Sequence, residues 1–116
     1  MSPSDCLFCR IARGEIPADL VHEGERLIAF RDISPQAPFH VLVIPREHIQ
    51  SLGDAEVGHG ALLGEALLLA AEIAAREGVA EEGYRTVVNT GKDGGQTVHH
   101  LHVHILGGRS LGWPPG

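Results

Sequence analysis

Three histidines alternate with apolar residues near the end of this 116-residue chain, in the segment 100–106 (HLHVHIL). Side chains two residues apart on a β-strand project from the same face. A strand over this segment would therefore gather His100, His102 and His104 on one surface. Imidazole titrates near neutral pH and can act as a nucleophile, an acid, a base or a metal ligand. The alternation predicts a chemical site.

A glycine-rich segment, residues 90–97 (TGKDGGQT), precedes these histidines. Glycine allows backbone N–H groups to approach an anion closely, and Gln96 and Thr97 add side-chain donors at the same place. We expect a flexible loop that forms a phosphate cradle facing the imidazoles. His102 has another imidazole on each side, which makes it the best-placed nucleophile.

Cys6 and Cys9 form a second candidate site, separate from the first. A cysteine pair with a two-residue gap indicates zinc or redox chemistry in a reducing compartment. A closed, structural zinc site needs two further ligands, for which His48 and His100 are the candidates. His99 is an alternative ligand, although it points to the opposite face of a regular strand. The simpler alternative is two inert, reduced cysteines on a helix.

The elements that must position these residues follow from hydrophobic periodicity and from turn residues. Ser4 can cap a short helix that Gly14 ends, and a proline-rich turn occupies residues 34–38. Strands are expected at residues 20–22, 26–32, 39–44, 84–89 and 100–106, and a long helix at 59–77. The prediction is an α+β fold with a mostly antiparallel sheet of five strands, one long helix and one short helix.

The long helix is apolar around more than half of its circumference, so we expect it to be covered on two sides. A subunit interface would provide the second cover. The alternative is a helix that is simply surrounded by the core of its own chain.

Composition limits the classes of function. The length of 116 residues and an apolar content of 43% fit one domain, residues 1–116. The net charge of −6 argues against sequence-independent binding to DNA or RNA. No segment resembles a signal peptide, and the longest apolar run, residues 66–71, is too short to cross a membrane. We expect a cytoplasmic protein that does not bind membranes, export by an unrecognised route being the alternative.

The segment 100–106 resembles the signature of the histidine triad (HIT) superfamily, His-φ-His-φ-His-φ-φ with φ apolar, at every position. Within that superfamily the chain resembles the Hint branch of nucleotide phosphoramidases. The resemblance extends from Asp5 to Gly116. The motifs that carry it are residues 32–38 (DISPQAP), His40, residues 43–45 (VIP), residues 93–96 (DGGQ) and the tail 113–116 (WPPG). It implies a HIT-like sheet that extends across a homodimer.

The resemblance implies a mechanism in two steps. His102 attacks the α-phosphorus of a nucleoside 5′-phosphoramidate of the AMP-amine type, and a nucleotidyl-histidine intermediate forms as the amine leaves. Water then releases the nucleoside monophosphate. His104 resembles the histidine that contacts the phosphate, and His40 the histidine that supports the triad. No cofactor is needed for the chemical step.

The resemblance also implies where the nucleotide binds. Asp32 would accept hydrogen bonds from the ribose hydroxyls, although it could be only a turn residue. Asn89 would lie near the ribose and phosphate, beside the backbone of Gly95 and the hydroxyl of Thr97. The tail residue Trp113 would lie near an active site, in some members that of the partner subunit. The positions around the base are apolar and could equally be ordinary core: Phe8, Ile11, Phe30, Ile33 and Leu42.

Bacterial members of the superfamily resemble this chain in a zinc set equivalent to Cys6, Cys9, His48 and His100, which makes His100 structural. Three other functions remain open at this point. The three alternating histidines could hold a catalytic metal. The chain could be a non-catalytic protein that binds nucleotides or a partner. It could also be a dinucleoside polyphosphate hydrolase.

Overall fold

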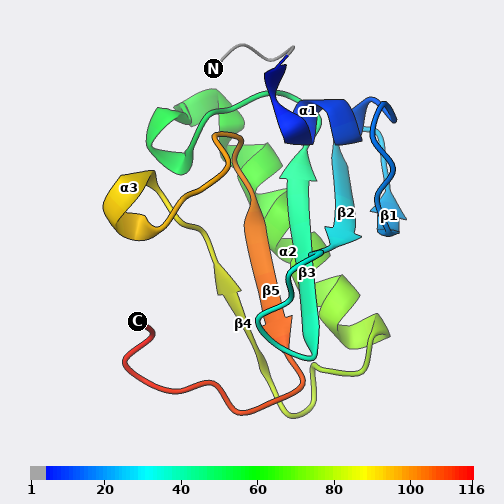
Figure 1. Cartoon of the computed structure of the whole chain (residues 1–116), viewed down its shortest axis with the longest axis vertical. Helices are drawn as coiled ribbons and strands as arrows, with labels where there is room; N and C mark the ends of the chain where they lie inside the picture. The colour runs from blue at the N-terminus through cyan, green and yellow to red at the C-terminus, as the bar shows by residue number, and fades with distance from the viewer. Residues whose placement is uncertain (1–4) are drawn as a thin grey trace.

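The computed structural model describes residues 5–116. Ser4, the expected helix cap, lies outside the described residues. Figure 1 shows the chain, and its helices and strands are α1 (Leu7–Ala12), β1 (Leu20–Glu23), β2 (Leu27–Arg31), β3 (Phe39–Pro45), α2 (Gly60–Arg76), β4 (Tyr84–Val87), α3 (Gly91–Gly94) and β5 (Val103–Gly107), with 3-10 turns at Leu52–Asp54 and Val57–His59.

The strands form one five-stranded sheet in the order β1-β2-β3-β5-β4. All neighbouring strands are antiparallel, which confirms the predicted fold class. The last strand of the chain, β5, lies between β3 and β4 (Figure 1). His40 on β3 pairs with Leu106, and Leu42 pairs with His104. This topology brings the C-terminal histidines beside the middle of the chain.

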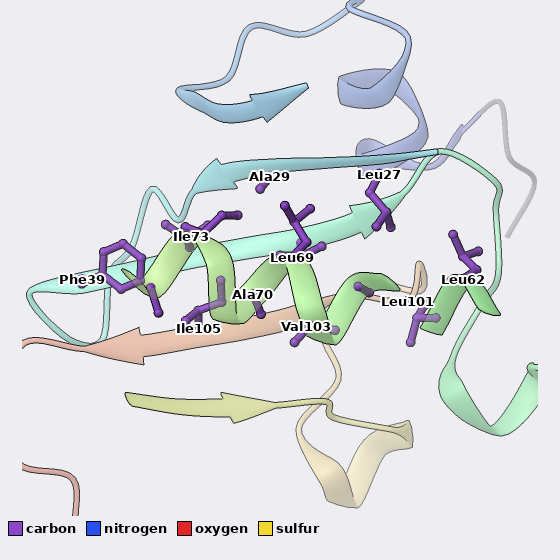
Figure 2. Packing of buried hydrophobic residues seen from close by; sticks show 14 of the residues in the cluster. Leu27, Ala29, Phe39, Leu62, Leu69, Ala70, Ile73, Leu101, Val103 and Ile105 are labelled. Atoms are coloured by element: carbon purple, nitrogen blue, oxygen red, sulfur yellow. The ribbon is translucent and has the colours of Figure 1, made fainter. Parts of the chain in front are cut away.

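Helix α2 covers one face of the sheet, as Figure 2 shows. Burial of a large aliphatic side chain contributes roughly 1.5–3 kcal/mol, and this layer holds the larger of the two clusters of buried apolar residues. The helix lies within one residue at each end of the predicted range 59–77. The buried residues on α2 recur at helical spacing: Leu62, Ala66, Leu69, Ala70, Ile73 and Ala74.

Helix α1 packs on the opposite face. Neighbouring residues of a strand point to opposite faces, and on β3 Val41 and Val43 contact the α2 layer, whereas Leu42 and Ile44 contact the α1 layer. The Sγ atom of Cys6 caps α1 by accepting a hydrogen bond from the Cys9 backbone N–H at 3.4 Å. A thiol that the sequence marks as a ligand therefore also begins the helix.

The structure corrects two expectations near the histidines. Part of the glycine-rich segment, expected to be a flexible loop, forms the short helix α3, and β5 begins at Val103 instead of residue 100. Residues 98–102 lie outside the strand because Leu101 donates its backbone N–H to the Ile49 carbonyl, at 2.7 Å, instead of to a neighbouring strand. His100 and His102 thus lie on an irregular segment that leads into β5.

The segment Val57–Arg76 is 20 residues long with a mean hydropathy of 1.4, enough by length and composition alone to cross a membrane. The longest apolar run did not reveal this segment, because glycines and isolated polar residues divide the segment into shorter apolar runs. A single helix of this kind is weak evidence for a membrane span, since the core helix of a soluble protein meets the same criteria. Here the segment contains α2, whose buried residues pack against the sheet.

Candidate active site

A cavity of about 320 Å³ joins α1, β2, β3 and the C-terminal histidines. Most of its lining is apolar, and its polar groups include the hydroxyl of Thr97, the carboxylate of Asp32 and two imidazoles. Ile16, Pro17 and Ala18 also line the cavity, which the sequence did not indicate. The expected site residues that line it are Phe8, Ile11, Phe30, Asp32, Ile33, Leu42, Thr97, His102 and His104.

The tautomer of His102 follows from its hydrogen bond. Its Nδ1 atom lies 2.7 Å from the backbone carbonyl oxygen of His100. A carbonyl can only accept, so Nδ1 carries the proton and Nε2 keeps a free lone pair. Burial lowers the pKa of His102, although the bond to the His100 carbonyl opposes this, so the ring is neutral near neutral pH. The ring can therefore act as a nucleophile.

His40 and His104 form a hydrogen-bonded pair with a defined direction. The backbone N–H of Gln36 donates to His40 Nδ1 at 3.0 Å, so the His40 proton lies on Nε2. That Nε2–H lies 2.9 Å from His104 Nδ1, which must accept. The His104 proton is therefore on Nε2. Next to the lone pair of His102, the cavity thus has a second imidazole with an N–H to donate.

Burial also governs the charge of this pair. It lowers the pKa of His40, and the nearby Asp32 carboxylate opposes the effect. The pKa of His104 is lowered to about 4, mainly by burial and then by repulsion from protonated His102 and His40. Since burial lowers the pKa of His40, His102 and His104, all three rings are neutral at physiological pH.

Asp32 serves two purposes. Its Oδ1 atom accepts the backbone N–H of Ser34 at 2.8 Å, which fixes the turn before the prolines. Its Oδ2 atom lies 3.5 Å from His40 Nε2. The carboxylate also lines the cavity, so its place in the turn is compatible with the predicted contact to the ribose.

A second group of side chains lies beside the cavity. The Sγ atoms of Cys6 and Cys9 and the Nδ1 atoms of His48 and His100 all lie within 4.8 Å of one another. We call these four residues the Cys2His2 cluster. It is the set that the sequence favoured for zinc, and His99, the alternative ligand, is exposed and outside it.

The geometry of the Cys2His2 cluster fits a metal ion. Tetrahedral zinc places neighbouring S and N ligand atoms roughly 3.3–3.8 Å apart. The Sγ–Nδ1 distances here are 3.2–3.4 Å, and the two Nδ1 atoms are 3.3 Å apart. His100 donates its Nε2–H to the Pro45 carbonyl at 2.8 Å, so its Nδ1 has a single lone pair facing three partners. One cation would satisfy all of these contacts.

The thiol chemistry points the same way. Burial raises the pKa of the Cys9 thiol to about 11, and the adjacent Cys6 adds to the shift. Without a cation this thiol stays protonated at neutral pH, whereas a bound metal stabilises the thiolate.

The structure does not support the alternative in which the three alternating histidines share a catalytic metal. His100 turns its Nδ1 toward the cysteines, and among the described residues His102 belongs to no group that could hold a metal. Asp32, His40 and His104 do form such a group. The 2.9 Å between the two imidazole nitrogens of that group is a hydrogen-bond distance, shorter than zinc ligands adopt.

Gln96 does not have the expected role of donor to an anion. The side chain is buried, and its Oε1 accepts the Gly91 N–H at 2.9 Å. Its Nε2 group donates to the carbonyl oxygens of Gln50 and Val98. Gln96 therefore fastens the glycine-rich segment from inside, because the backbone carbonyls of that segment need buried donors.

Three other expected residues lie outside the cavity lining. Gly95, exposed at the end of α3, has φ +85°, a conformation that favours glycine. Asn89 is partly buried and does not line the cavity. Trp113 is 82% exposed on a tail that Arg85 holds through the Gly112 carbonyl. Within one chain, the tail does not reach the histidines.

The sequence did not reveal the backbone groups that set the tautomers. These are the Gln36 N–H and the carbonyl oxygens of Pro45 and His100. Every residue type offers such a carbonyl, and all but proline offer an N–H, so no pattern could have identified them.

The buried His104 makes folding stability depend on pH. Its folded pKa of about 4 lies below its ordinary value of 6.5, so the unfolded chain binds a proton first as the pH falls. Stability is retained above the ordinary pKa and lost as the pH falls toward the folded one. Between about pH 7.5 and about pH 4.5 we expect urea titration to show a loss of about 2 kcal/mol from this residue. A His104→Asn variant should lack this part of the loss, and identical pH dependence in both proteins would contradict the assignment.

Comparison with known proteins agrees with the fold and the triad. The HIT domain family matches residues 13–111. A Synechococcus elongatus protein described as an uncharacterized HIT-like protein is 60% identical over 112 residues, covering 97% of each chain. The purine nucleoside phosphoramidase of Escherichia coli K12 is 49% identical over 108 residues, covering 93% of this chain and 91% of that protein.

Solved structures agree as well. The crystal structure of a HIT family hydrolase from Legionella pneumophila gives a TM-score of 0.95 at 51% identity and covers 97% of this chain and 100% of that one. A histidine triad protein from Clostridium difficile gives 0.93 at 43% identity, covering 97% of each chain. With its antiparallel sheet, its alternating histidines and these matches, the chain belongs to the histidine triad (HIT) superfamily and is Hint-like.

Proposed function

We propose that this protein is a hydrolase that cleaves the P–N bond of nucleoside 5′-phosphoramidates through a nucleotidyl-histidine intermediate on His102. One observation carries the proposal. The lone pair of His102 Nε2 and the donor Nε2–H of His104 belong to neighbouring rings, 4.9 Å apart between centroids, that line one cavity. The 49% identical relative from Escherichia coli, named a purine nucleoside phosphoramidase, supports the same activity.

The cavity can take the nucleotide in one orientation. The base fits against the apolar part of the lining, which includes Phe8 and Phe30, whose own rings meet edge to face at 5.4 Å. The Asp32 carboxylate, which is 20% exposed, can accept the ribose hydroxyls. The α-phosphate then lies beside Thr97 and His104, the donors in the cavity lining.

The chemistry proceeds by two displacements at phosphorus. His102 Nε2 forms a bond to the α-phosphorus while the P–N bond breaks, and the nitrogen leaves as an amine with the bonding pair and a proton. Water then attacks the same phosphorus and the P–Nε2 bond breaks, which returns the lone pair to His102. The proton that water releases balances the one that the amine took up. The His104 N–H stabilises the charge that develops on the phosphate oxygens.

The test is to trap the intermediate. The protein is mixed with adenosine 5′-phosphoramidate, quenched within milliseconds and examined by intact-mass spectrometry. We expect a mass increase of one adenylyl group, which peptide mapping assigns to His102. Turnover without an adduct, or an adduct on another residue, would reject the proposal.

The zinc site is part of the proposal. The fit of the Cys2His2 cluster supports a closed structural Zn²⁺, which would join α1 to the segment before β5 and supply no catalytic water. The buried free thiols of Cys6 and Cys9 also favour a cytoplasmic location, where thiols stay reduced.

We also propose a homodimer. The outer face of α2 exposes Leu67 by 50% and Leu68 by 73%, and β4 is an edge strand of the sheet. An apolar helix face beside an open strand edge suits a symmetric contact that continues the sheet. Monomeric sedimentation at high protein concentration would overturn this.

A further inference from the structure

The Cys2His2 cluster and the proposed nucleophile have one residue in common. His100 offers its Nδ1 atom to the cluster, 3.3 Å from Cys6 Sγ, while its backbone carbonyl accepts the Nδ1–H of His102 at 2.7 Å. A displacement of His100 therefore changes the hydrogen bond that leaves His102 Nε2 with its lone pair.

The backbone of His100 is not held by the sheet. It lies in residues 98–102, before β5 begins at Val103. Apart from the cluster, its neighbourhood is fixed by the Leu101 N–H to the Ile49 carbonyl and by its own Nε2–H to the Pro45 carbonyl. The His100 ring is fully buried, and its one described hydrogen bond outside the cluster is at Nε2. Contacts at Nδ1 add a second polar restraint on the ring and so on its backbone carbonyl.

A second route passes through Phe8, which lies between the two cysteines on α1. Its ring meets the His102 ring edge to face, with centroids 5.1 Å apart and planes at 88°, and it meets the His100 ring at 6.0 Å. Helix α1 has only six residues, too few to be stable without tertiary contacts. The cysteines before and after Phe8 are therefore the natural anchors of its ring.

We propose that the Cys2His2 cluster, when it holds Zn²⁺, positions the nucleophile His102 through the His100 carbonyl and the Phe8 ring. His100 and Phe8 are thus positioning residues, and metal loading sets the fraction of molecules in which His102 is aligned and in the reactive tautomer. This inference rests on the proposed phosphoramidase function for its kinetic consequence, but its structural consequence is independent of the substrate.

The test varies His48, a cluster ligand that lies on a different segment from His102 and does not line the cavity. His48→Ala removes a ligand, and His48→Cys replaces it with another zinc ligand. For each variant we would measure bound zinc, kcat and KM for adenosine 5′-phosphoramidate, and the ¹⁵N and ¹H NMR signals of the His102 ring. Ile73→Val, a change in the α2 core, controls for a general loss of stability, and zinc-stripped wild-type protein repeats the test without a mutation.

We expect kcat to follow zinc content across the series. The zinc-free proteins should lose about tenfold in kcat with a smaller change in KM, because Asp32, Thr97 and His104 stay in place and only the Phe8 part of the base contact shifts, whereas the attacking nitrogen is misaligned. Their His102 Nδ1–H signal should exchange rapidly with solvent, whereas Ile73→Val should resemble the wild type.

Two results would overturn the inference. One is a folded, zinc-free protein with the wild-type kcat and the wild-type His102 ring signals. The other is a wild-type protein that contains no zinc and takes up none from Zn²⁺ solution. If the wild type does not hydrolyse phosphoramidates at all, the proposed function fails, and the NMR signals alone then decide whether the cluster positions His102.

Discussion

Replacing His102 by asparagine should abolish hydrolysis of adenosine 5′-phosphoramidate and leave AMP binding measurable. The asparagine amide can still donate to the His100 carbonyl, but it has no basic lone pair to attack phosphorus. We expect a loss of kcat greater than about a thousandfold, which corresponds to about 4 kcal/mol of transition-state stabilisation. Steady-state kinetics and calorimetric titration with AMP measure the two effects separately.

His99→Asn is the matched control, since it changes an exposed histidine three residues away in the same segment. It should retain wild-type turnover. A loss of kcat/KM of only about tenfold in the His102 variant, about 1.4 kcal/mol, would favour a non-catalytic nucleotide-binding protein. An equal loss of binding and turnover would contradict the role of nucleophile.

The double substitution Cys6→Ala/Cys9→Ala should remove bound zinc and lower the melting temperature by about 10 °C or more. A structural zinc site contributes its binding free energy to folding, and about 3 kcal/mol is enough for such a shift in a chain of this size. The loss should be large here because both thiols are buried in the layer between α1 and the sheet. Elemental analysis and thermal unfolding followed by circular dichroism provide the measurements.

A chelator gives the control for this prediction. It should lower the melting temperature of the wild type toward that of the double variant and leave the variant unchanged, as expected when a ligand binds only the folded state. Equal zinc content in the wild type and the double variant would contradict a zinc site at these cysteines.

The periodicity of the sequence predicted the scaffold well, for reasons that particular elements make clear. The alternation on β3 and the helical spacing on α2 both reflect burial in one continuous core, and burial is what such patterns report. The predicted ends of strands were less accurate where hydrogen bonds to residues outside the sheet compete with the hydrogen bonds between strands. The Leu101 N–H to the Ile49 carbonyl delays the start of β5 by three residues relative to the predicted 100–106.

That delay explains the main difference at the candidate site. The alternation predicted that His100, His102 and His104 share one surface, which requires a regular strand through all three. In the structure His100 turns its Nδ1 to the cysteines, while the other two rings line the cavity. Gln96 was misjudged for a related reason, because a side-chain amide beside glycines can bind the loop itself as readily as an anion.

The directed hydrogen bonds around the cavity also bear on the design of covalent ligands. Among the described histidines of this region, Nδ1 of His40 faces the Gln36 N–H, Nδ1 of His104 faces His40, and Nδ1 of His100 faces the cysteines. Of these four rings, His102 is the one whose remaining lone pair, on Nε2, has no partner among the described hydrogen bonds, and His102 lines the cavity. A ligand that fills the cavity and carries a group that acylates or phosphorylates imidazole should therefore react at this atom before the other three rings.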